Sequence, residues 1–269
     1  LFGREWRGRP YPRQSPTNPS SLPMKTFQPL DSVALITGAG RKNGIGKGTV
    51  DALLAAGAAR VYVAVRDPQA ARPIYAAAGA RVRLIDLDVT QVGRAASLAR
   101  ELGDVNLLIH NAGLFTGATA LGDEADQRRE FEVNVFGPLA LTRAFAPILA
   151  QNGGGALVLI NSVASHFSFP LGASYSASKA ALHSFTQALR RELAAQGTRV
   201  LGVYPGPIDT DMAEKIDMPK TSPAEVGRRI VAALQAGEED LTPDATGAEM
   251  LATFRRDPKA FERYLASMG

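Results

Sequence analysis

VALITGAGRKNGIG, residues 33–46, joins an apolar, β-branched run to a glycine-rich turn and then to a stretch with helical spacing. Glycine lets the backbone turn sharply and approach a bound phosphate group, which then lies at the positive end of the following helix. Such a turn after the first strand of an α/β alternation predicts a dinucleotide-binding site, and a purely structural turn is the alternative. The candidate cofactor contacts in this turn are Gly38, Gly40, Arg41, Lys42, Asn43, Gly44, Ile45 and Gly46.

Apolar runs of the same kind recur along the chain and alternate with stretches of helical spacing. Because the runs are apolar throughout, both faces of the predicted sheet should be covered. The alternation predicts a single doubly wound Rossmann domain over residues 31–269, with a parallel sheet of about seven strands and helices on both faces. The expected strands are 33–37, 61–65, 82–86, 105–110, 156–161, 200–204 and 240–242, and the expected helices are 45–57, 68–78, 91–102, 124–151, 173–196, 222–236 and 246–267.

The amino-acid composition excludes several kinds of functional site. The chain of 269 residues has no cysteine, which excludes disulfides, thiolate zinc sites and cysteine nucleophiles. Three histidines make a histidine metal cluster an unfavoured reading, so no metal is predicted. No apolar run approaches the roughly 20 residues needed to cross a bilayer. We therefore expect a soluble, cytoplasmic protein without a membrane partner.

The positive charge is concentrated at the start of the chain. Five basic side chains and one glutamate within residues 1–30 account for the whole net charge of +4, so the remainder gives no argument for nucleic acid. Residues 1–30 are rich in proline, arginine and serine without an apolar period, which predicts a flexible tail. Because the first methionine is Met24, we interpret most of this tail as added or upstream translated sequence. A basic targeting arm and an arm that docks on a neighbouring subunit are the alternatives.

A second stretch, INSVASHFSFPLGASYSASK at residues 160–179, predicts a proton-transfer site. If its second half is helical, Tyr175 and Lys179 lie one turn apart on the same face. The ammonium group would then stabilise a phenolate and lower the tyrosine pKa from about 10. Ser162 follows a predicted strand and would hold the substrate oxygen beside the tyrosine.

The end of the second predicted strand bears on the choice of cofactor. Arg66 is the first polar residue there, and Arg41 and Lys42 add two positive charges in the glycine-rich turn. These cations favour NADP(H) over NAD(H), because NAD sites place an acidic group near the ribose hydroxyls. In the competing interpretation Asp67 is that acidic group, and the protein is an NAD-dependent alcohol dehydrogenase.

With these motifs in order, the chain resembles the short-chain dehydrogenase/reductase family from Thr37 to about Thr210. The resemblance implies that Asn134, Ser162, Tyr175 and Lys179 form a catalytic tetrad, with Asn134 supporting a water-linked proton relay. It also implies cofactor contacts from a pair that meets the adenine, from an NAG element, from the catalytic tyrosine and lysine, and from a segment that holds the nicotinamide carboxamide. These residues are Asp88 and Val89; Asn111, Ala112 and Gly113; Tyr175 and Lys179; and Pro205, Gly206, Ile208 and Thr210.

Two departures from the family pattern stand out. Five residues separate Gly38 from Gly44, where the family normally has three. The chain also ends in an amphipathic helical stretch instead of the family's glycine-containing tail. We expect a homodimer through residues 124–151 and 173–196, with the homotetramer that is common in the family as the alternative.

The residues and the resemblance together predict an NADPH-dependent carbonyl reductase or secondary alcohol dehydrogenase with Tyr175 as general acid/base. The expected substrate is a small apolar or aromatic ketone or alcohol, because the candidate pocket residues form an apolar wall. An acyl-carrier ketoreductase and a non-catalytic NADP(H)-sensing protein are the remaining alternatives. The candidate pocket residues are Phe115, His166, Phe169 and Met212.

Overall fold

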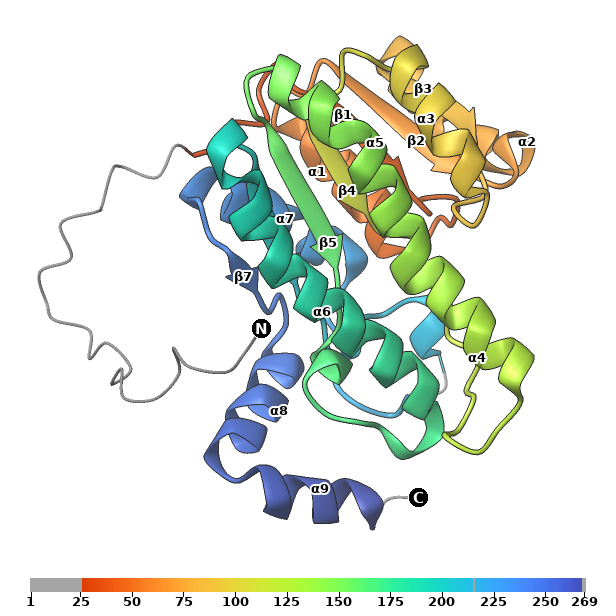
Figure 1. Cartoon of the computed structure of the whole chain (residues 1–269), viewed down its shortest axis with the longest axis vertical. Helices are drawn as coiled ribbons and strands as arrows, with labels where there is room; N and C mark the ends of the chain where they lie inside the picture. The colour runs from red at the N-terminus through yellow and green to blue at the C-terminus, as the bar shows by residue number, and fades with distance from the viewer. Residues whose placement is uncertain (1–25, 215, 268–269) are drawn as a thin grey trace, which may run out of the picture.

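The computed structural model describes residues 26–214 and 216–267. Most of the predicted N-terminal tail, residues 1–25, therefore lies outside the described residues. The seven strands form one parallel sheet in the order β3-β2-β1-β4-β5-β6-β7, which confirms the predicted Rossmann fold (Figure 1). The strands are β1 (Val33–Thr37), β2 (Arg60–Val65), β3 (Val82–Asp86), β4 (Leu107–His110), β5 (Ala156–Ile160), β6 (Arg199–Val203) and β7 (Asp240–Leu241).

Helices cover both faces of the sheet, as the uniformly apolar strands predict. Within β1, Ala34 and Ile36 point into one core and Leu35 into the other. The first core is closed by α1 (Ile45–Ala55), the 3₁₀ segment η1 (Arg72–Arg81) and α7 (Pro223–Ala236). The second is closed by α3 (Val92–Glu101), α5 (Gly137–Gln151) and α6 (Ala173–Leu193).

The strand order reverses between β1 and β4, which pair directly. The chain builds β1, β2 and β3 outward in one direction and then returns to place β4 on the other side of β1. Loops at the carboxyl ends of the two strands diverge at such a point and leave a crevice, where doubly wound folds bind ligands. The glycine-rich turn follows β1, and the predicted NAG element follows β4.

Three predicted helices differ in detail. The stretch 68–78 is one short turn, α2 (Pro68–Ala71), continued by η1, in which Gly79 has a φ of +58°. The stretch 124–151 consists of α4 (Glu124–Phe131) and α5 joined by a π-helical turn, η2 (Glu132–Phe136). The last stretch divides into α8 (Ala245–Arg256) and α9 (Pro258–Ala266), because Asp257 before Pro258 takes an extended conformation. Both helices lie at the lower end of Figure 1, near the loops that precede α6.

One helical stretch, Glu124–Gln151, is long and apolar enough to span a membrane by length and composition alone, contrary to our reading of the sequence. Several of its apolar side chains belong to the core beside the sheet. Leu141, Phe145 and Leu149 are completely or almost completely buried in the second core. Packing against the sheet therefore accounts for much of its apolar character.

Candidate active site

The loops after β1 and β4 interlock by direct contact of backbone with backbone. Gly38 has a φ of +71°, and a Cβ atom there would lie 2.5 Å from the Cα of Ala112. A Cβ on Gly46 would lie 2.6 Å from Nδ2 of Asn111. That amide donates hydrogen bonds to the carbonyls of Thr37 and Gly38, both at 3.0 Å. The structure thus brings the glycine-rich turn and the NAG element together at the crevice, with bare backbone where a dinucleotide needs it, so these residues fit the cofactor.

The enlarged part of the glycine-rich turn reaches across to the segment after β6. Arg41, Lys42 and Asn43 are all exposed. The guanidinium of Arg41 lies 3.4 Å from the carboxylate of Asp211, which directly follows Thr210. Both side chains are more than half exposed, so this ion pair stabilises the fold little. It does link the glycine-rich turn to the end of the predicted nicotinamide segment through a basic side chain.

At the end of β2, Arg66 and Asp67 have different surroundings. Oδ1 of Asp67 accepts hydrogen bonds from the backbone N–H groups of Gln69 and Ala70, each at 3.0 Å, and so caps α2. Arg66 is exposed, and no pair with Asp67 forms. Its positive charge acts on Asp88, whose pKa is lowered chiefly by the backbone N–H of Thr90 and further by Arg66. The candidate NAD-type acid is therefore engaged in the fold, while the cation is available.

Tyr175 and Lys179 lie one turn apart near the start of α6, as predicted. Lys179 is almost completely buried, and its ammonium lies 5.6 Å from the centre of the Tyr175 ring. The ammonium donates a hydrogen bond of 2.7 Å to the carbonyl of Ile160, the last residue of β5. The lysine is thus anchored to the sheet and faces the ring of the tyrosine.

The prediction that the pKa of Tyr175 is lowered is wrong. Burial raises the pKa of Tyr175 to about 12; a hydrogen bond from Ser162 opposes the rise, and the negative charge of Glu130 adds to it. Burial likewise lowers the pKa of Lys179 to about 8. Loss of water around both groups outweighs their attraction because the lysine hydrogen-bonds a carbonyl rather than the phenol.

The Ser162 hydroxyl caps the loop after β5 and also acts on Tyr175. Its hydroxyl accepts a hydrogen bond of 3.1 Å from the N–H of Ala164, which caps the 3₁₀ turn η3 (Val163–Ser165). It also donates weakly, at 3.4 Å, to the carbonyl of Pro205. The loop-capping interpretation and the catalytic one are therefore compatible, since the same hydroxyl also lies close enough to Tyr175 to lower its pKa.

Asn134 lies in the π-helical turn η2, a feature that often marks functional sites. It is completely buried; Oδ1 accepts from the N–H of Leu114 at 2.8 Å, and Nδ2 donates to the Leu114 carbonyl and to Ser178, both at 2.9 Å. A Cβ on Gly113 would lie 3.6 Å from Asn134 and 3.8 Å from the Lys179 ammonium. The four tetrad residues are thus gathered around one point, although the proton relay itself stays a prediction.

The predicted nicotinamide segment, Pro205 to Thr210, is held by a residue that we did not predict. Asp244 is almost completely buried, and its two carboxylate oxygens accept from the N–H of Gly206 at 2.7 Å and of Gly247 at 2.6 Å. It caps α8 and ties that helix to the cofactor side. Its place before a helical stretch is a signal that could have identified the cap, but nothing in the sequence indicated the contact with Gly206.

The four candidate pocket residues separate into distinct groups. Phe115 stands edge-on to Tyr175, with ring centres 5.3 Å apart, and is 42% exposed. Met212 is 48% exposed in the short turn after Thr210. His166 instead packs against His183 and Tyr204, with ring centres 4.8 and 5.2 Å away. Among the four candidate pocket residues, Phe115 is thus the one whose ring contacts Tyr175.

Phe169 belongs to an aromatic cluster that we define as Phe167, Phe169, Phe254 and Phe261. Phe167 lies at its centre, with its ring 5.3 Å from Phe169, 5.5 Å from Phe254 and 4.8 Å from Phe261. The cluster ties the loop before α6 to α8 and α9. The C-terminal helices therefore hold the loop that follows Ser162.

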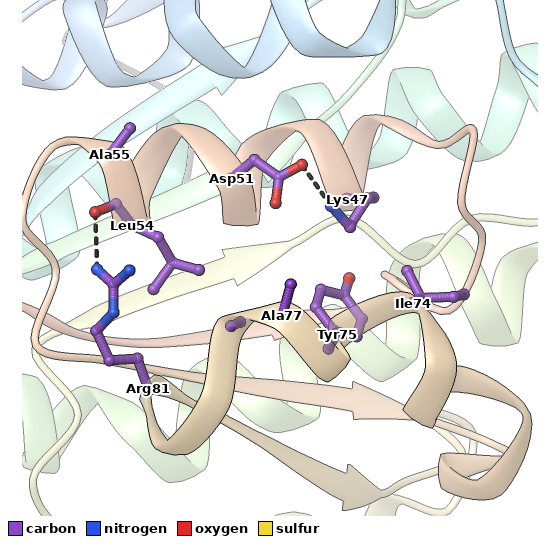
Figure 2. Close-up of a pocket in the computed structure, with 9 residues that line it drawn as sticks. Lys47, Asp51, Leu54, Ala55, Ile74, Tyr75, Ala77 and Arg81 are labelled. Atoms are coloured by element: carbon purple, nitrogen blue, oxygen red, sulfur yellow. Dashed lines mark hydrogen bonds and ion pairs between the residues drawn. The ribbon is translucent and has the colours of Figure 1, made fainter.

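A separate hollow of about 340 Å³ lies between α1 and η1, and Figure 2 shows the side chains that line it. Its polar groups already have partners: Lys47 pairs with Asp51 at 2.5 Å, and Arg81 donates to the carbonyl of Leu54 at 3.0 Å. Tyr75 donates to the carbonyl of Ala39 at 2.6 Å and so supports the glycine-rich turn from outside. None of the predicted site residues lines this hollow.

The family model for short chain dehydrogenases matches residues 32–221. The chain belongs to the short-chain dehydrogenase/reductase family and is an NAD(P)-dependent oxidoreductase. A short chain dehydrogenase from Burkholderia cenocepacia J2315, solved in complex with NADP, is 37% identical; the superposition has a TM-score of 0.81 and covers 89% of this chain and 99% of that one.

Curated relatives span similar parts of the chain. Galactitol 2-dehydrogenase of Agrobacterium fabrum is 34% identical over 70% of this chain and 74% of that protein. NADP-dependent 3-hydroxy acid dehydrogenase of Schizosaccharomyces pombe is 32% identical over 66% of this chain and 72% of that protein. The two names cover a sugar alcohol and a hydroxy acid, so the family alone leaves the substrate open.

Proposed function

We propose that the protein is an NADP(H)-dependent carbonyl reductase or secondary alcohol dehydrogenase in which Tyr175 is the general acid and base. The observation that carries this proposal is the surroundings of the phenol. Ser162 lies close enough to lower its pKa, Lys179 lies beneath its ring, and Phe115 packs against that ring. A hydroxyl partner and an apolar wall around one proton donor suit a carbonyl oxygen that must be oriented and protonated.

The raised pKa of Tyr175 favours the role of acid. With a pKa of about 12 the phenol is protonated at neutral pH, which is the form that donates a proton to a developing alkoxide. When bound, the reduced nicotinamide supplies the hydride that the carbonyl carbon receives. Ser162 orients the carbonyl oxygen, and Lys179 favours the phenolate that remains after the proton has left. Positioned acid catalysis of this kind contributes on the order of 10²–10⁴ in rate.

The preference for NADP(H) is supported by the end of β2. Asp67 caps α2 through Oδ1, whereas Arg66 is exposed and free of that carboxylate. A guanidinium is well suited to a phosphate because it is always charged and presents several donors. The NADP complex of the similar Burkholderia protein points the same way. An NAD-dependent dehydrogenase would instead need the Asp67 carboxylate to leave its cap or to share it.

The substrate and the assembly are parts of the same proposal. An apolar or aromatic ketone suits the wall formed by Phe115. Phe136 and Phe185 are 48% and 40% exposed beside and on the long helices, which supports a homodimer through α4–α5 and α6. We place the enzyme in the cytoplasm, with no nucleic acid or membrane as partner.

The test is NADPH oxidation against a panel of ketones, aldehydes, oxidised polyols and 3-oxo acids. Tyr175→Phe should lower turnover by on the order of 100-fold or more while the Kd for NADPH changes little. Tyr264→Phe, an exposed tyrosine on α9, is the matched control and should behave as the wild type. Substantial activity in Tyr175→Phe would contradict the proposal, and a higher kcat/KM with NADH than with NADPH would contradict its cofactor part.

A further inference from the structure

The loop that carries Phe115 lies along one face of α4 and η2 and is bound at three points. Asn134 holds Leu114, as described above. One turn earlier, Glu130 accepts hydrogen bonds at Oε1 from Thr116, at 2.6 Å from the backbone N–H and at 2.9 Å from the hydroxyl. Residues 127, 130 and 134 share a helix face, so the helix presents them as a row. The third contact is from Gln127 to the carbonyl of Thr119, at 2.9 Å.

The other side of this loop touches the start of the catalytic helix. The ring of Phe115 lies against Tyr175, and a Cβ on Gly172 would come within 2.7 Å of that ring. The carbonyl of Ala118 accepts a hydrogen bond of 3.2 Å from the N–H of Ser174. The position of Phe115 is therefore set from both sides, by α4 and by the first turn of α6.

Glu130 is an unusual residue for this task. It is completely buried, and its second oxygen, Oε2, has no hydrogen-bond partner among the described residues. Burying a carboxylate without a cation is costly, and a neutral glutamine could accept the same hydrogen bonds from Thr116. Anchoring the loop thus explains the position of the side chain but leaves its charge unexplained.

We propose that Glu130 is a positioning residue of the active site, which fixes Thr116 and thereby holds Phe115 against Tyr175 as the wall for the substrate. The proposal rests on the proposed function, because it takes Tyr175 as the proton donor. In this proposal Glu130 contacts neither the substrate nor the cofactor. It acts on Phe115 through the loop and on Tyr175 through its charge.

The charge of Glu130 has a role in the same site. The polar groups that act on the phenol are Lys179 from α6, Ser162 from the loop after β5 and Glu130 from α4. Burial is the largest cause of the raised pKa of Tyr175, and the carboxylate of Glu130 raises it further. A negative charge nearby disfavours the phenolate, so Glu130 helps to keep Tyr175 in the proton-donating form.

Two substitutions separate anchoring from charge. Glu130→Gln keeps an oxygen for Thr116 and removes the charge, so the KM for the carbonyl substrate should change less than about twofold. Its pH profile should shift, however: activity in carbonyl reduction should fall away at lower pH than in the wild type. Glu130→Ala removes the anchor as well and should raise that KM about tenfold, the effect of losing a hydrogen bond to a charged group. The Kd for NADPH should stay within about twofold in both, since the cofactor loops are untouched.

Two further variants serve as checks: one changes the hydrogen-bond partner of Glu130, and the other is a control. Thr116→Val removes one of the two hydrogen bonds from the other partner and should raise the KM in the same direction as Glu130→Ala, even if the alanine variant folds poorly. Glu132→Gln changes an exposed carboxylate two residues away and should alter neither KM nor pH profile. In the active wild-type enzyme, with Tyr175→Phe as the blank, an unshifted profile in Glu130→Gln together with an unchanged KM in Thr116→Val would overturn the role of Glu130 and leave the proposed function intact.

Discussion

The loops after β1 and β4 and the loops around Tyr175 both face the carboxyl edge of the sheet, but they are built differently. On the first side, which we call the cofactor side, backbone lies against backbone: Gly38 approaches Ala112 so closely that a Cβ would sit 2.5 Å from its Cα. On the second, the substrate side, the walls are side chains such as Phe115, held by contacts from α4. Backbone contacts suit a ligand that never changes, whereas side-chain walls can vary with the substrate.

This difference implies different sensitivity to substitution. Two backbones in van der Waals contact cannot separate without moving the strands that carry them, because protein interiors are close-packed. A side-chain wall can lose a group and leave the sheet undisturbed. We therefore expect substitutions on the cofactor side to act on stability and cofactor binding, and those on the substrate side to act on the KM for the substrate.

The largest effect is expected for Gly38→Ala. The added methyl group meets Ala112 and forces a positive φ on alanine, so the substitution should destabilise the protein by more than about 3 kcal/mol and abolish NADPH binding. Gly197→Ala is the matched control: its φ of +77° is similar, but no atom lies within 4 Å of the new Cβ. It should cost about 1 kcal/mol in urea unfolding. Equal losses in the two variants would show that the backbone contact is unimportant.

Lys179, which lies where the two sides meet, should give the protein an unusual pH dependence. Its folded pKa of about 8 is below the usual lysine value, so between about pH 8 and 10 the unfolded chain binds more protons than the folded one. The free energy of unfolding should therefore rise with pH over this range, by up to about 3 kcal/mol in total. Above about pH 10, Tyr175 acts in the opposite direction because its folded pKa is raised.

Lys179→Met tests this by removing the buried ammonium. The free energy of unfolding of the cofactor-free variant should change less between pH 8 and 10 than that of the wild type. Lys259→Met, on the surface of α9, should retain the wild-type slope. A wild-type slope in Lys179→Met would mean that the lysine is not the group responsible.

Asp244→Ala should show that the cofactor side also depends on the C-terminal helices. Loss of the buried carboxylate leaves the N–H groups of Gly206 and Gly247 unpaired, which should cost about 2 kcal/mol of stability and weaken NADPH binding about tenfold. Asp257→Ala removes an exposed helix cap on α9 and should cost about 1 kcal/mol without changing the Kd for NADPH. A tighter or unchanged Kd in Asp244→Ala would confine its role to the fold.

The smallest effect is expected for Phe115→Leu on the substrate side. The substitution removes the ring contact with Tyr175, which is worth about 1 kcal/mol, and so loosens the wall against which the substrate packs. The KM for the substrate should rise roughly fivefold, and the Kd for NADPH should not change. Phe254→Leu disturbs a comparable ring contact, with Phe167, and should change KM less. If both variants raise KM equally, the substrate wall extends into the aromatic cluster.

Several features were readable in the sequence because they depend on neighbouring residues. The apolar runs specify strands covered on both faces, and the spacing of Tyr175 and Lys179 places them on one helix face. The break at Asp257–Pro258 was also readable, since a residue before proline avoids the helical conformation, but we predicted one continuous helix there. The π-helical turn at Asn134 left no local signal.

The sequence by itself determined which segments are strands, where the glycine-rich turn lies, and which residue types occupy the candidate active site. Each of these follows from local periodicity and from the conformational freedom of glycine. The tertiary structure alone decided that the pKa of Tyr175 is raised, that Asp244 holds Gly206 across 38 residues of chain, and that Glu130 anchors the loop of Phe115. Desolvation and hydrogen bonds between distant segments depend on what folding brings together, and no local pattern encodes that.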